Sequence, residues 1–240
     1  MGNDIFDMIV LFDLEGTLVE TCFERSPEEL DALREMARAA IQELGIPREV
    51  LGGERTSSGM RNRALKFASD NLPEAYGEEV TRGIGQFMDV WESKMAEGYS
   101  LYPETVEVLG GLLDIGCQMG LVTSTTAKNV ESAFERFGLR RFFGPVITRE
   151  DVPLLKPDPA GILKALGILG YSSGDGPFYF VGDSRHDVTA ARRAGGIPIG
   201  VDRGFFRLSG SGPDHAVDDL RGVIPIVTDL KNVHGSSHVG

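Results

Sequence analysis

Short apolar runs alternate with helical patterns over most of the chain beyond residue 100. Strands are predicted where three to five apolar residues stand together, at 8–12, 119–122, 145–147, 178–181 and 197–201. Apolar residues at three- and four-residue spacing predict the intervening helices, at 103–113, 128–137, 159–166 and 186–194. This alternation indicates an α/β fold whose mostly parallel sheet is covered on both faces.

The region between residues 20 and 100 has a different pattern, because its apolar spacing is helical throughout. Helices are expected at 27–44, around 60–68 and at 80–95, with no strand-like alternation between them. The predicted division is a core formed by residues 1–19 and 101–240 and an all-helical cap formed by 20–100. A last short strand is expected at Ala216 and Val217, and the polar tail at 231–240 is expected to be loose.

Composition and charge narrow the function classes. The chain has 36 acidic and 24 basic residues, a net charge of -12, which argues against a nucleic-acid or anionic-membrane surface. Its two cysteines, Cys22 and Cys117, form no disulfide framework and suggest a reducing compartment. Asp4 and Asp7 precede the first apolar run, so neither a signal peptide nor a membrane span is predicted there. A cytoplasmic location is expected; the oligomeric state is open.

The first strand ends in the segment DLEGTL, residues 13–18. Side chains two apart in an extended segment point the same way, so Asp13 and Glu15 are expected to face one crevice. Open α/β sheets bind ligands at this edge, where the strands end. Gly16 permits a tight turn and lets backbone N–H groups approach an anion. The two carboxylates could serve as nucleophile and proton shuttle; the alternative is an ordinary strand end with a capping aspartate.

Two later segments could bind an anion. Thr123 and Ser124 follow the strand at 119–122 directly before a helix, where hydroxyls and a helix N-terminus favour phosphate. They could equally serve as simple helix caps. Lys156 stands between two leucines and two prolines, a stiff setting for a lysine, although an isolated lysine is usually solvated.

The strand at 178–181 ends in GDSRHD, residues 182–187. Asp183 terminates the strand and Asp187 follows about one helical turn later, so the two carboxylates can converge. Oxygen ligands at a strand end suit a hard divalent cation such as Mg²⁺. The alternative is that both aspartates only cap the following helix.

Electrostatics connects these segments. Asp13, Glu15, Asp183 and Asp187 in one crevice would repel one another, and at least one would be driven towards protonation. A bound divalent cation together with Lys156 would relieve that repulsion. The same positive charges could hold a phosphate dianion and stabilise charge during phosphoryl transfer.

Taken in order, these segments resemble the four motifs of the haloacid dehalogenase superfamily, and its phosphoglycolate-phosphatase-like members in particular. The matching residues are Asp13 to Thr17, Thr123, Lys156, and Gly182 to Asp187. The resemblance spans the chain and implies a Rossmann-like core with a helical cap inserted after the first motif. It also implies a Mg²⁺-dependent phosphatase acting on a small phosphorylated metabolite.

The resemblance implies specific roles. Asp13 would attack phosphorus to give an aspartyl-phosphate, and Glu15 would protonate the leaving group and then activate water. Thr123, Ser124 and Lys156 would bind phosphate. The metal ligands would be Asp13, the carbonyl of Glu15, Asp183 and, in support, Asp187.

Glu15 departs from the usual pattern, because most phosphatases of the superfamily carry aspartate there. Enolase-phosphatases of the superfamily also show glutamate, but residues 123–125 (TST) do not resemble their second motif. A phosphomutase shares every core residue and stays open, whereas a dehalogenase would need no second carboxylate or metal. The alternative that is not an enzyme is a catalytically inactive binding module. Such a module should have lost the nucleophile or the metal-binding carboxylates, and this chain retains all of them.

The cap offers one hint about the substrate. Four basic residues cluster in one segment of this acidic chain: Arg55, Arg61, Arg63 and Lys66. They would suit a substrate with a second anionic group beside its phosphate. The alternative is a solvated helical face.

Overall fold

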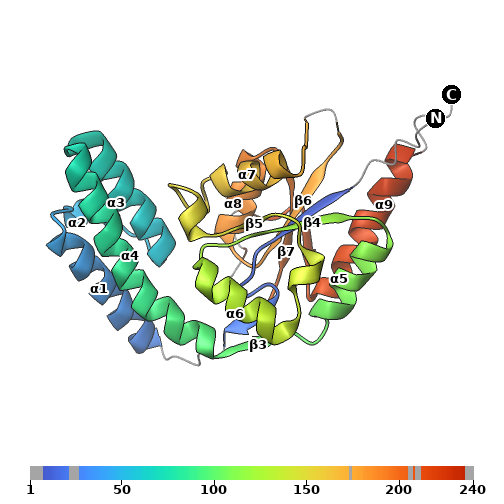
Figure 1. Cartoon of the computed structure of the whole chain (residues 1–240), viewed down its shortest axis with the longest axis horizontal. Coiled ribbons are helices and arrows are strands. Elements are labelled where there is room, and N and C mark those ends of the chain that lie inside the picture. The colour runs from blue at the N-terminus through green and yellow to red at the C-terminus, as the bar shows by residue number, and fades with distance from the viewer. Residues whose placement is uncertain (1–7, 22–26, 173–174, 205–207, 209–211, 236–240) are drawn as a thin grey trace.

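A six-stranded parallel sheet forms the centre of the computed structural model (Figure 1). The structure describes residues 8–235 apart from 22–26, 173–174, 205–207 and 209–211. Along the sheet the strands are β5 (Val146–Ile147), β4 (Gln118–Val122), β1 (Ile9–Phe12), β6 (Phe178–Gly182), β7 (Ile197–Val201) and β8 (His215–Val217). Every strand predicted from an apolar run is present, to within about two residues.

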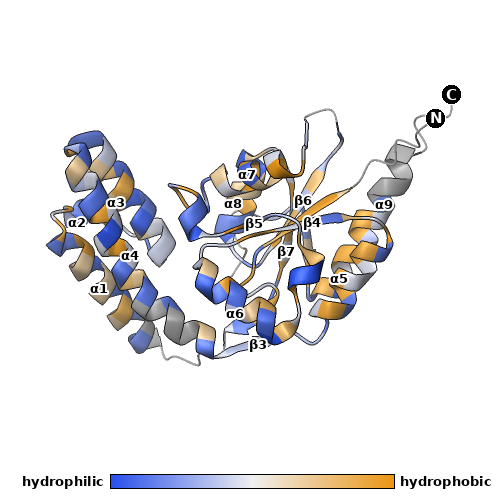
Figure 2. Ribbon diagram, in the orientation of Figure 1, coloured by the Kyte–Doolittle hydropathy of each residue, from blue (hydrophilic) through white to orange (hydrophobic). Residues whose placement is uncertain are grey.

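Helices cover both faces of the sheet. Successive side chains of β1 point to opposite faces and pack against different helices. Val10 and Phe12 belong to the core cluster beneath α5 (Thr105–Asp114), α6 (Ala127–Phe137) and α9 (Val223–Gly235). Ile9 and Leu11 belong to the opposite cluster, beneath α7 (Ala160–Ile168) and α8 (Arg185–Arg193). The strands and α5 are strongly hydrophobic in Figure 2, as expected for a sheet buried on both sides. The predicted α/β fold is confirmed.

Strand register brings three loop segments to one edge. Phe12 at the end of β1 is aligned with Leu121 of β4 and with Val181 of β6. The residues that follow these strands therefore leave the sheet side by side. These are the segments in which the sequence places its candidate chemistry.

Four helices form a separate layer, the insert predicted after the first motif (Figure 1). They are α1 (Pro27–Glu43), α2 (Arg48–Leu51), α3 (Ser57–Asn71) and α4 (Glu74–Glu97). Their buried apolar side chains form a third hydrophobic cluster, which Leu155 from beyond the insert also joins. The three longer helices were predicted; α2 was not, because four residues are too few to show a period.

Two short strands join this insert to the sheet domain. β2 (Val19–Thr21) and β3 (Tyr99–Leu101) pair antiparallel, with Thr21 opposite Tyr99. The expectation that no strand occurs between residues 20 and 100 is therefore wrong at both ends of that range. Three-residue strands carry too little alternation to be recognised. Cys22 lies outside the described residues.

The C-terminal expectation also needs correction. Helix α9 continues to Gly235, so residues 231–235 are helical and not loose. Val223 and Val227, one turn apart, are fully buried against the sheet domain and explain why a helix forms here. Three short 3₁₀ helices complete the described part: η1 (Arg140–Phe142), η2 (Arg149–Asp151) and η3 (Leu220–Gly222). None of the helices described is long and apolar enough to cross a membrane.

Candidate active site

Asp13 stands directly after β1 and is 8% exposed. Its backbone N–H donates to the carbonyl of Val181, at 3.0 Å, which fixes the residue beside β6. One carboxylate oxygen each of Asp13, Asp183 and Asp187 lie within 4.8 Å of one another. The structure thus brings together the three aspartates that the sequence predicted to converge.

Asp187 has two functions in the structure. Its Oδ2 accepts hydrogen bonds from the backbone N–H of Ser184, at 3.0 Å, and from the Ser184 hydroxyl, at 2.5 Å, in a capping box at the start of α8. Its Oδ1 faces Lys156. Oδ2 of Asp187 therefore caps the helix, as the alternative interpretation expects, whereas Oδ1 belongs to the cluster with Asp13 and Lys156. Gly182 makes room, because a Cβ there would lie 2.4 Å from the Cβ of Asp187.

Lys156 is buried and paired with two of these carboxylates. Its Nζ lies 2.7 Å from Oδ1 of Asp13 and 2.7 Å from Oδ1 of Asp187. The side chain is 6% exposed, so the alternative of a solvated lysine is wrong. A buried amine between two carboxylates is a fixed positive charge where the motifs converge.

Burial, together with the repulsion expected between the carboxylates, raises the pKa of two of them. Burial, opposed by Lys156 and reinforced by Asp187, raises the pKa of Asp13 to about 7. Burial and the charges of Asp187 and Asp13 raise the pKa of Asp183 well above its ordinary value. Burial alone would lower the pKa of Lys156, but Asp13 and Asp187 raise it above its usual range.

The donor set fits a hard divalent cation. Three buried carboxyl groups lie together beside one ammonium group, and the pKa of two of them is raised, so a bound cation would stabilise their ionised forms. Carboxylate oxygens at this spacing are the ligands that Mg²⁺ prefers. Asp13, Asp183 and Asp187 could therefore hold such an ion.

Glu15 lies in the turn that follows β1 and faces β3, one of the two strands that join the insert to the sheet domain. Its Oε1 accepts a hydrogen bond from the hydroxyl of Tyr99. Burial raises its pKa, while the Tyr99 hydrogen bond and the charges of Lys156 and Arg149 lower it, and burial prevails. A carboxyl with a raised pKa near a buried ammonium is suited to giving and taking a proton.

Thr123 and Ser124 leave β4 as predicted, Thr123 buried and Ser124 half-buried. The backbone N–H of Thr123 donates to the carbonyl of Ile147, at 2.9 Å. The N-cap of α6 is Thr126, whose hydroxyl oxygen accepts from the backbone N–H of Asn129 at 3.1 Å. Thr123 and Ser124 are therefore not the helix caps, and the capping alternative is wrong for both.

A buried polar cluster that was not predicted lies beside this site. Arg149 of η2 pairs with Glu92 of α4, Nη1 to Oε2, at 2.9 Å. The hydroxyl of Thr125, next to Ser124, donates to the same Glu92 oxygen at 3.5 Å. Burial, opposed by Arg149, raises the pKa of Glu92 to about 8. Arg149 could have been found by the rule that found Asp13, because it stands just beyond a strand, β5, at the same sheet edge.

The helical insert contacts the loop that carries Lys156. The side chain of Asn62 in α3 donates to the carbonyl of Leu155, at 2.5 Å, and accepts from its N–H, at 2.9 Å. Leu155 itself is 2% exposed and packs in the hydrophobic cluster of the insert. The residue before Lys156 is therefore held by the insert, not by the sheet.

The four basic residues of the predicted cap cluster do not act together. Arg55, Arg63 and Lys66 are half or more exposed and pair with Asp31, Glu54 and Asp70, as a solvated face would. Arg61 is 6% exposed and reaches the sheet domain, where its Nη1 donates to the carbonyl of Pro153 at 2.9 Å. The alternative of a solvated face therefore describes Arg55, Arg63 and Lys66. Arg61 differs from them because it is buried, and its part in substrate binding stays a prediction.

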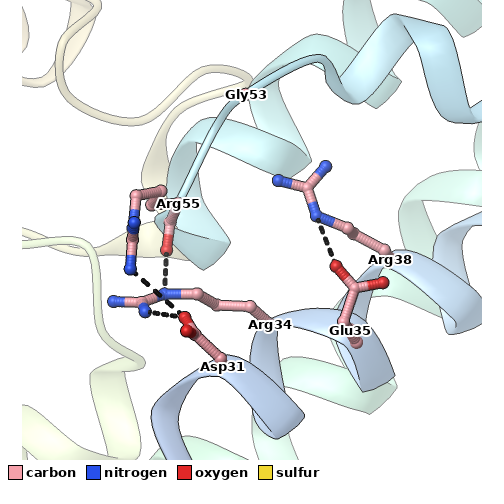
Figure 3. Close-up of a pocket in the computed structure, with 6 residues that line it drawn as sticks. All are labelled: Asp31, Arg34, Glu35, Arg38, Gly53 and Arg55. Atoms are coloured by element: carbon pink, nitrogen blue, oxygen red, sulfur yellow. Dashed lines mark hydrogen bonds and ion pairs between the residues drawn. The ribbon is translucent and has the colours of Figure 1, made fainter. Parts of the chain in front are cut away.

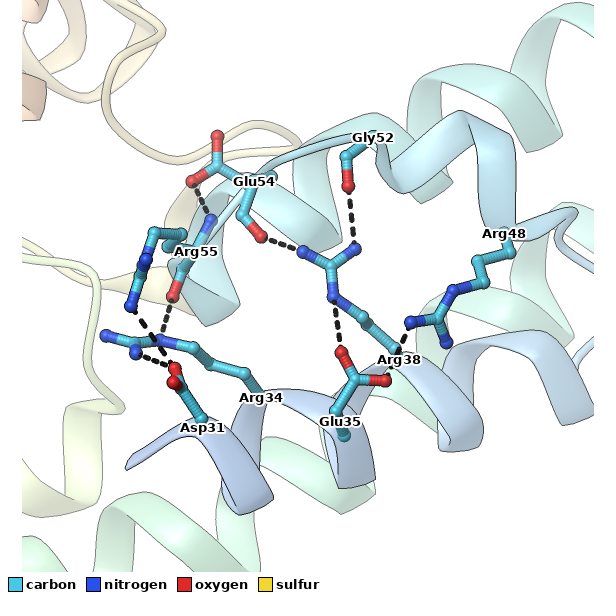
Figure 4. A network of polar contacts seen from close by, with 8 residues as sticks. All are labelled: Asp31, Arg34, Glu35, Arg38, Arg48, Gly52, Glu54 and Arg55. Atoms are coloured by element: carbon cyan, nitrogen blue, oxygen red, sulfur yellow. Dashed lines mark hydrogen bonds and ion pairs between the residues drawn. The ribbon is translucent and has the colours of Figure 1, made fainter. Parts of the chain in front are cut away.

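A pocket lies on the insert between α1 and the loop before α3 (Figure 3). It is lined by Asp31, Arg34, Glu35, Arg38, Gly53 and Arg55. Figure 4 shows that the guanidinium groups are already engaged: Arg34 and Arg55 with Asp31, and Arg38 with Glu35 and the carbonyls of Gly52 and Glu54. These contacts hold α1 against the loop. Of the residues predicted to bind substrate, the pocket contains only Arg55, and it contains none of the motif residues.

Comparison with known proteins agrees with this geometry. The family model "Haloacid dehalogenase-like hydrolase" matches residues 10–201. A phosphoglycolate phosphatase of Pseudomonas syringae pv. tomato is 32% identical, over 92% of this chain and 80% of the relative. One from Salmonella typhi is 31% identical, over 90% of each chain.

Solved structures agree on the fold. A predicted phosphoglycolate phosphatase from Haemophilus somnus superposes with a TM-score of 0.60 at 24% identity, covering 92% of this chain and 98% of that one. CbbY from Rhodobacter sphaeroides, in complex with phosphate, gives 0.58 at 24% identity, covering 89% and 95%. With its motifs at one sheet edge and a family match over most of its length, this chain belongs to the haloacid dehalogenase-like hydrolases.

Proposed function

We propose that this protein is a Mg²⁺-dependent phosphatase that hydrolyses a small phosphorylated metabolite through an aspartyl-phosphate. The observation that carries the proposal is the buried contact of Asp13 with Lys156, beside Asp183 and Asp187. The names of the relatives support a phosphorylated hydroxy acid, phosphoglycolate first, as the substrate to test.

In the first step Asp13 is the nucleophile. A carboxylate oxygen of Asp13 attacks phosphorus, the bond to the ester oxygen breaks, and its electron pair leaves with that oxygen. Glu15 gives its proton to the leaving oxygen. Burial works against an ionised Asp13, so the ammonium of Lys156 at 2.7 Å is needed to keep the nucleophile charged.

In the second step Glu15 accepts a proton from water, which attacks phosphorus and releases inorganic phosphate and free Asp13. Lys156, Thr123 and Ser124 bind the phosphoryl oxygens in both steps. Asp13, Asp183, Asp187 and the carbonyl of Glu15 would hold Mg²⁺. The ion would supply positive charge that offsets the carboxylates and stabilises the transferring phosphoryl group.

Release of inorganic phosphate from phosphoglycolate and from an aryl phosphate, with Mg²⁺ and with excess chelator, tests the proposal. Asp13→Asn should abolish release, because an amide is neither a nucleophile nor an anionic ligand. A phosphomutase would isomerise a sugar phosphate without net phosphate release, and an inactive binding module would show no turnover. Full activity in chelator or in Asp13→Asn would refute the mechanism.

The remaining expectations belong to the same proposal. We infer a core of residues 1–19 and 101–240 and a cap of 20–100, with the cap covering the site. A net charge of -12 supports a small-molecule partner and no nucleic acid. A cytoplasmic location stays a prediction.

A further inference from the structure

One buried arginine, Arg61, forms no ion pair with a carboxylate in the part of the chain that the structure describes. Among the described residues, four arginines have side chains less than a tenth exposed: Arg38, Arg61, Arg149 and Arg203. Arg203 lies 2.8 Å from Glu104. Arg38 lies 3.4 Å from Glu35, and Arg149 lies 2.9 Å from Glu92. For Arg61 the described part of the chain offers no carboxylate within 4.0 Å, only the carbonyl of Pro153. The charges of Glu92 and Glu150 act on the Arg61 guanidinium only from beyond contact distance. A buried guanidinium without a carboxylate in contact is costly, so an anion from outside the chain would stabilise it.

Arg61 lies beside the loop that carries Lys156. It reaches from α3 to Pro153, three residues before Lys156. Its neighbour Asn62 holds both backbone groups of Leu155. The Arg61 guanidinium is also electrostatically coupled to Arg149 and Glu92, and Glu92 contacts the segment that carries Ser124. Arg61 thus contacts the loop that precedes Lys156 and lies within electrostatic range of the Arg149–Glu92 pair, which contacts Thr125 beside Ser124.

We propose that Arg61 binds a carboxylate of the substrate while the phosphate occupies the site at Asp13 and Lys156. This inference rests on the proposed phosphatase function and names its substrate class, a short phosphorylated hydroxy acid. The guanidinium fork matches a carboxylate in a bidentate geometry, and only one of its N–H groups is used by Pro153. Arg149 adds a second positive charge to the same region, although Glu92 and Asp89 pair with it.

Arg61→Gln tests this on two substrates that differ in the carboxylate, phosphoglycolate and ethyl phosphate. Arg63→Gln is the matched control, because it removes the same charge from the exposed side of the same helix. Loss of a charge-assisted pair should lower kcat/KM for phosphoglycolate roughly 10- to 100-fold, mostly through KM. Activity on ethyl phosphate should change by less than about threefold. Arg63→Gln should leave the ratio between the two substrates unchanged.

Equal losses of Arg61→Gln on both substrates would overturn the inference, because Arg61 would then only fasten the cap to the Pro153 loop. A wild-type enzyme without preference for phosphoglycolate over ethyl phosphate would overturn it too, with the phosphatase proposal intact. If the wild type hydrolyses neither ester, the phosphatase proposal fails, and calorimetric binding of phosphoglycolate decides the role of Arg61. If phosphoglycolate binds more weakly to Arg61→Gln than to the wild type and to Arg63→Gln, the proposed role of Arg61 is supported. Equal binding to all three proteins would reject that role.

Discussion

The hydroxyl of Tyr99 donates a hydrogen bond to Oε1 of Glu15, at the place where the chain returns from the insert to the sheet domain. Tyr99 is 2% exposed and lies in β3, the strand by which the chain returns from the insert. Burial and the charge of Glu15 raise the pKa of Tyr99 far above its ordinary value, so the hydroxyl keeps its proton. The carboxyl of Glu15 is therefore positioned by β3, and a shift of β3 would move that carboxyl.

Tyr99→Phe should lower kcat on an alkyl phosphate roughly 5- to 30-fold, because a buried carboxyl loses its partner and its fixed position. The effect on an aryl phosphate should be smaller, since a good leaving group needs less help from the acid. KM should stay near that of the wild type. Tyr179→Phe is the control: Tyr179 is fully buried, and its hydroxyl has no hydrogen-bond partner in the described part of the chain. Equal loss in both variants, or equal loss on both substrates, would show that Tyr99 only packs.

Gly16→Ala should weaken metal binding. Gly16 has a φ of +78°, and a Cβ there would lie 2.3 Å from Oδ2 of Asp183. Gly138→Ala has a comparable backbone penalty, at φ +68°, but its Cβ would meet nothing within 4 Å. Both variants should lose about 1–2 kcal/mol of stability from the left-handed backbone. Only Gly16→Ala should also lose the stabilisation that Mg²⁺ gives in denaturant unfolding; an unchanged Mg²⁺ effect would argue against Asp183 as a ligand.

Glu92 should make the stability of the protein depend on pH. Its folded pKa of about 8 lies above the ordinary value of 4.5, so the folded state holds the proton more tightly. The resulting stabilisation is complete below the unfolded pKa and is lost as the pH rises through about 8. Urea unfolding between about pH 5 and pH 9 should therefore show a declining stability. The decline should be shallower in Glu92→Gln, and the remainder comes from Asp13, Glu15 and Asp183, whose pKa values are also raised. Asp89→Asn removes the exposed partner of the same Arg149 and should keep the decline. An unchanged decline in Glu92→Gln would contradict the assignment.

Leu155 should connect the stability of the insert to the activity of the site. Leu155→Ala opens a hole in the hydrophobic cluster of the insert and should cost about 2–4 kcal/mol in unfolding free energy. The same change should lower activity, because Lys156 follows directly. Leu163→Ala, at a leucine that is half exposed on α7, should cost much less and leave activity intact. Similar unfolding costs in the two variants would mean that Leu155 is not held by the insert.

The sheet and its site could be predicted from sequence because the signals are local. Strands buried on both faces are continuous apolar runs, and the motif residues follow them directly. Tyr99 lies 84 positions from Glu15, so no local pattern connects the two. Arg61 and Arg63 show the same limit, since residues two apart on a helix point to different sides. The sequence placed them in one cluster; the fold separates them.

The central claim, that Asp13 becomes phosphorylated, can be measured directly in Glu15→Gln, in which hydrolysis of the intermediate should be slowed. The variant is mixed with Mg²⁺ and an aryl phosphate, quenched and treated with borohydride, which reduces an acyl phosphate to an alcohol. Peptide mass spectrometry should then find homoserine at position 13, and none in Asp13→Asn/Glu15→Gln. Unmodified aspartate at position 13, with phosphate release continuing at the wild-type rate, would contradict the account.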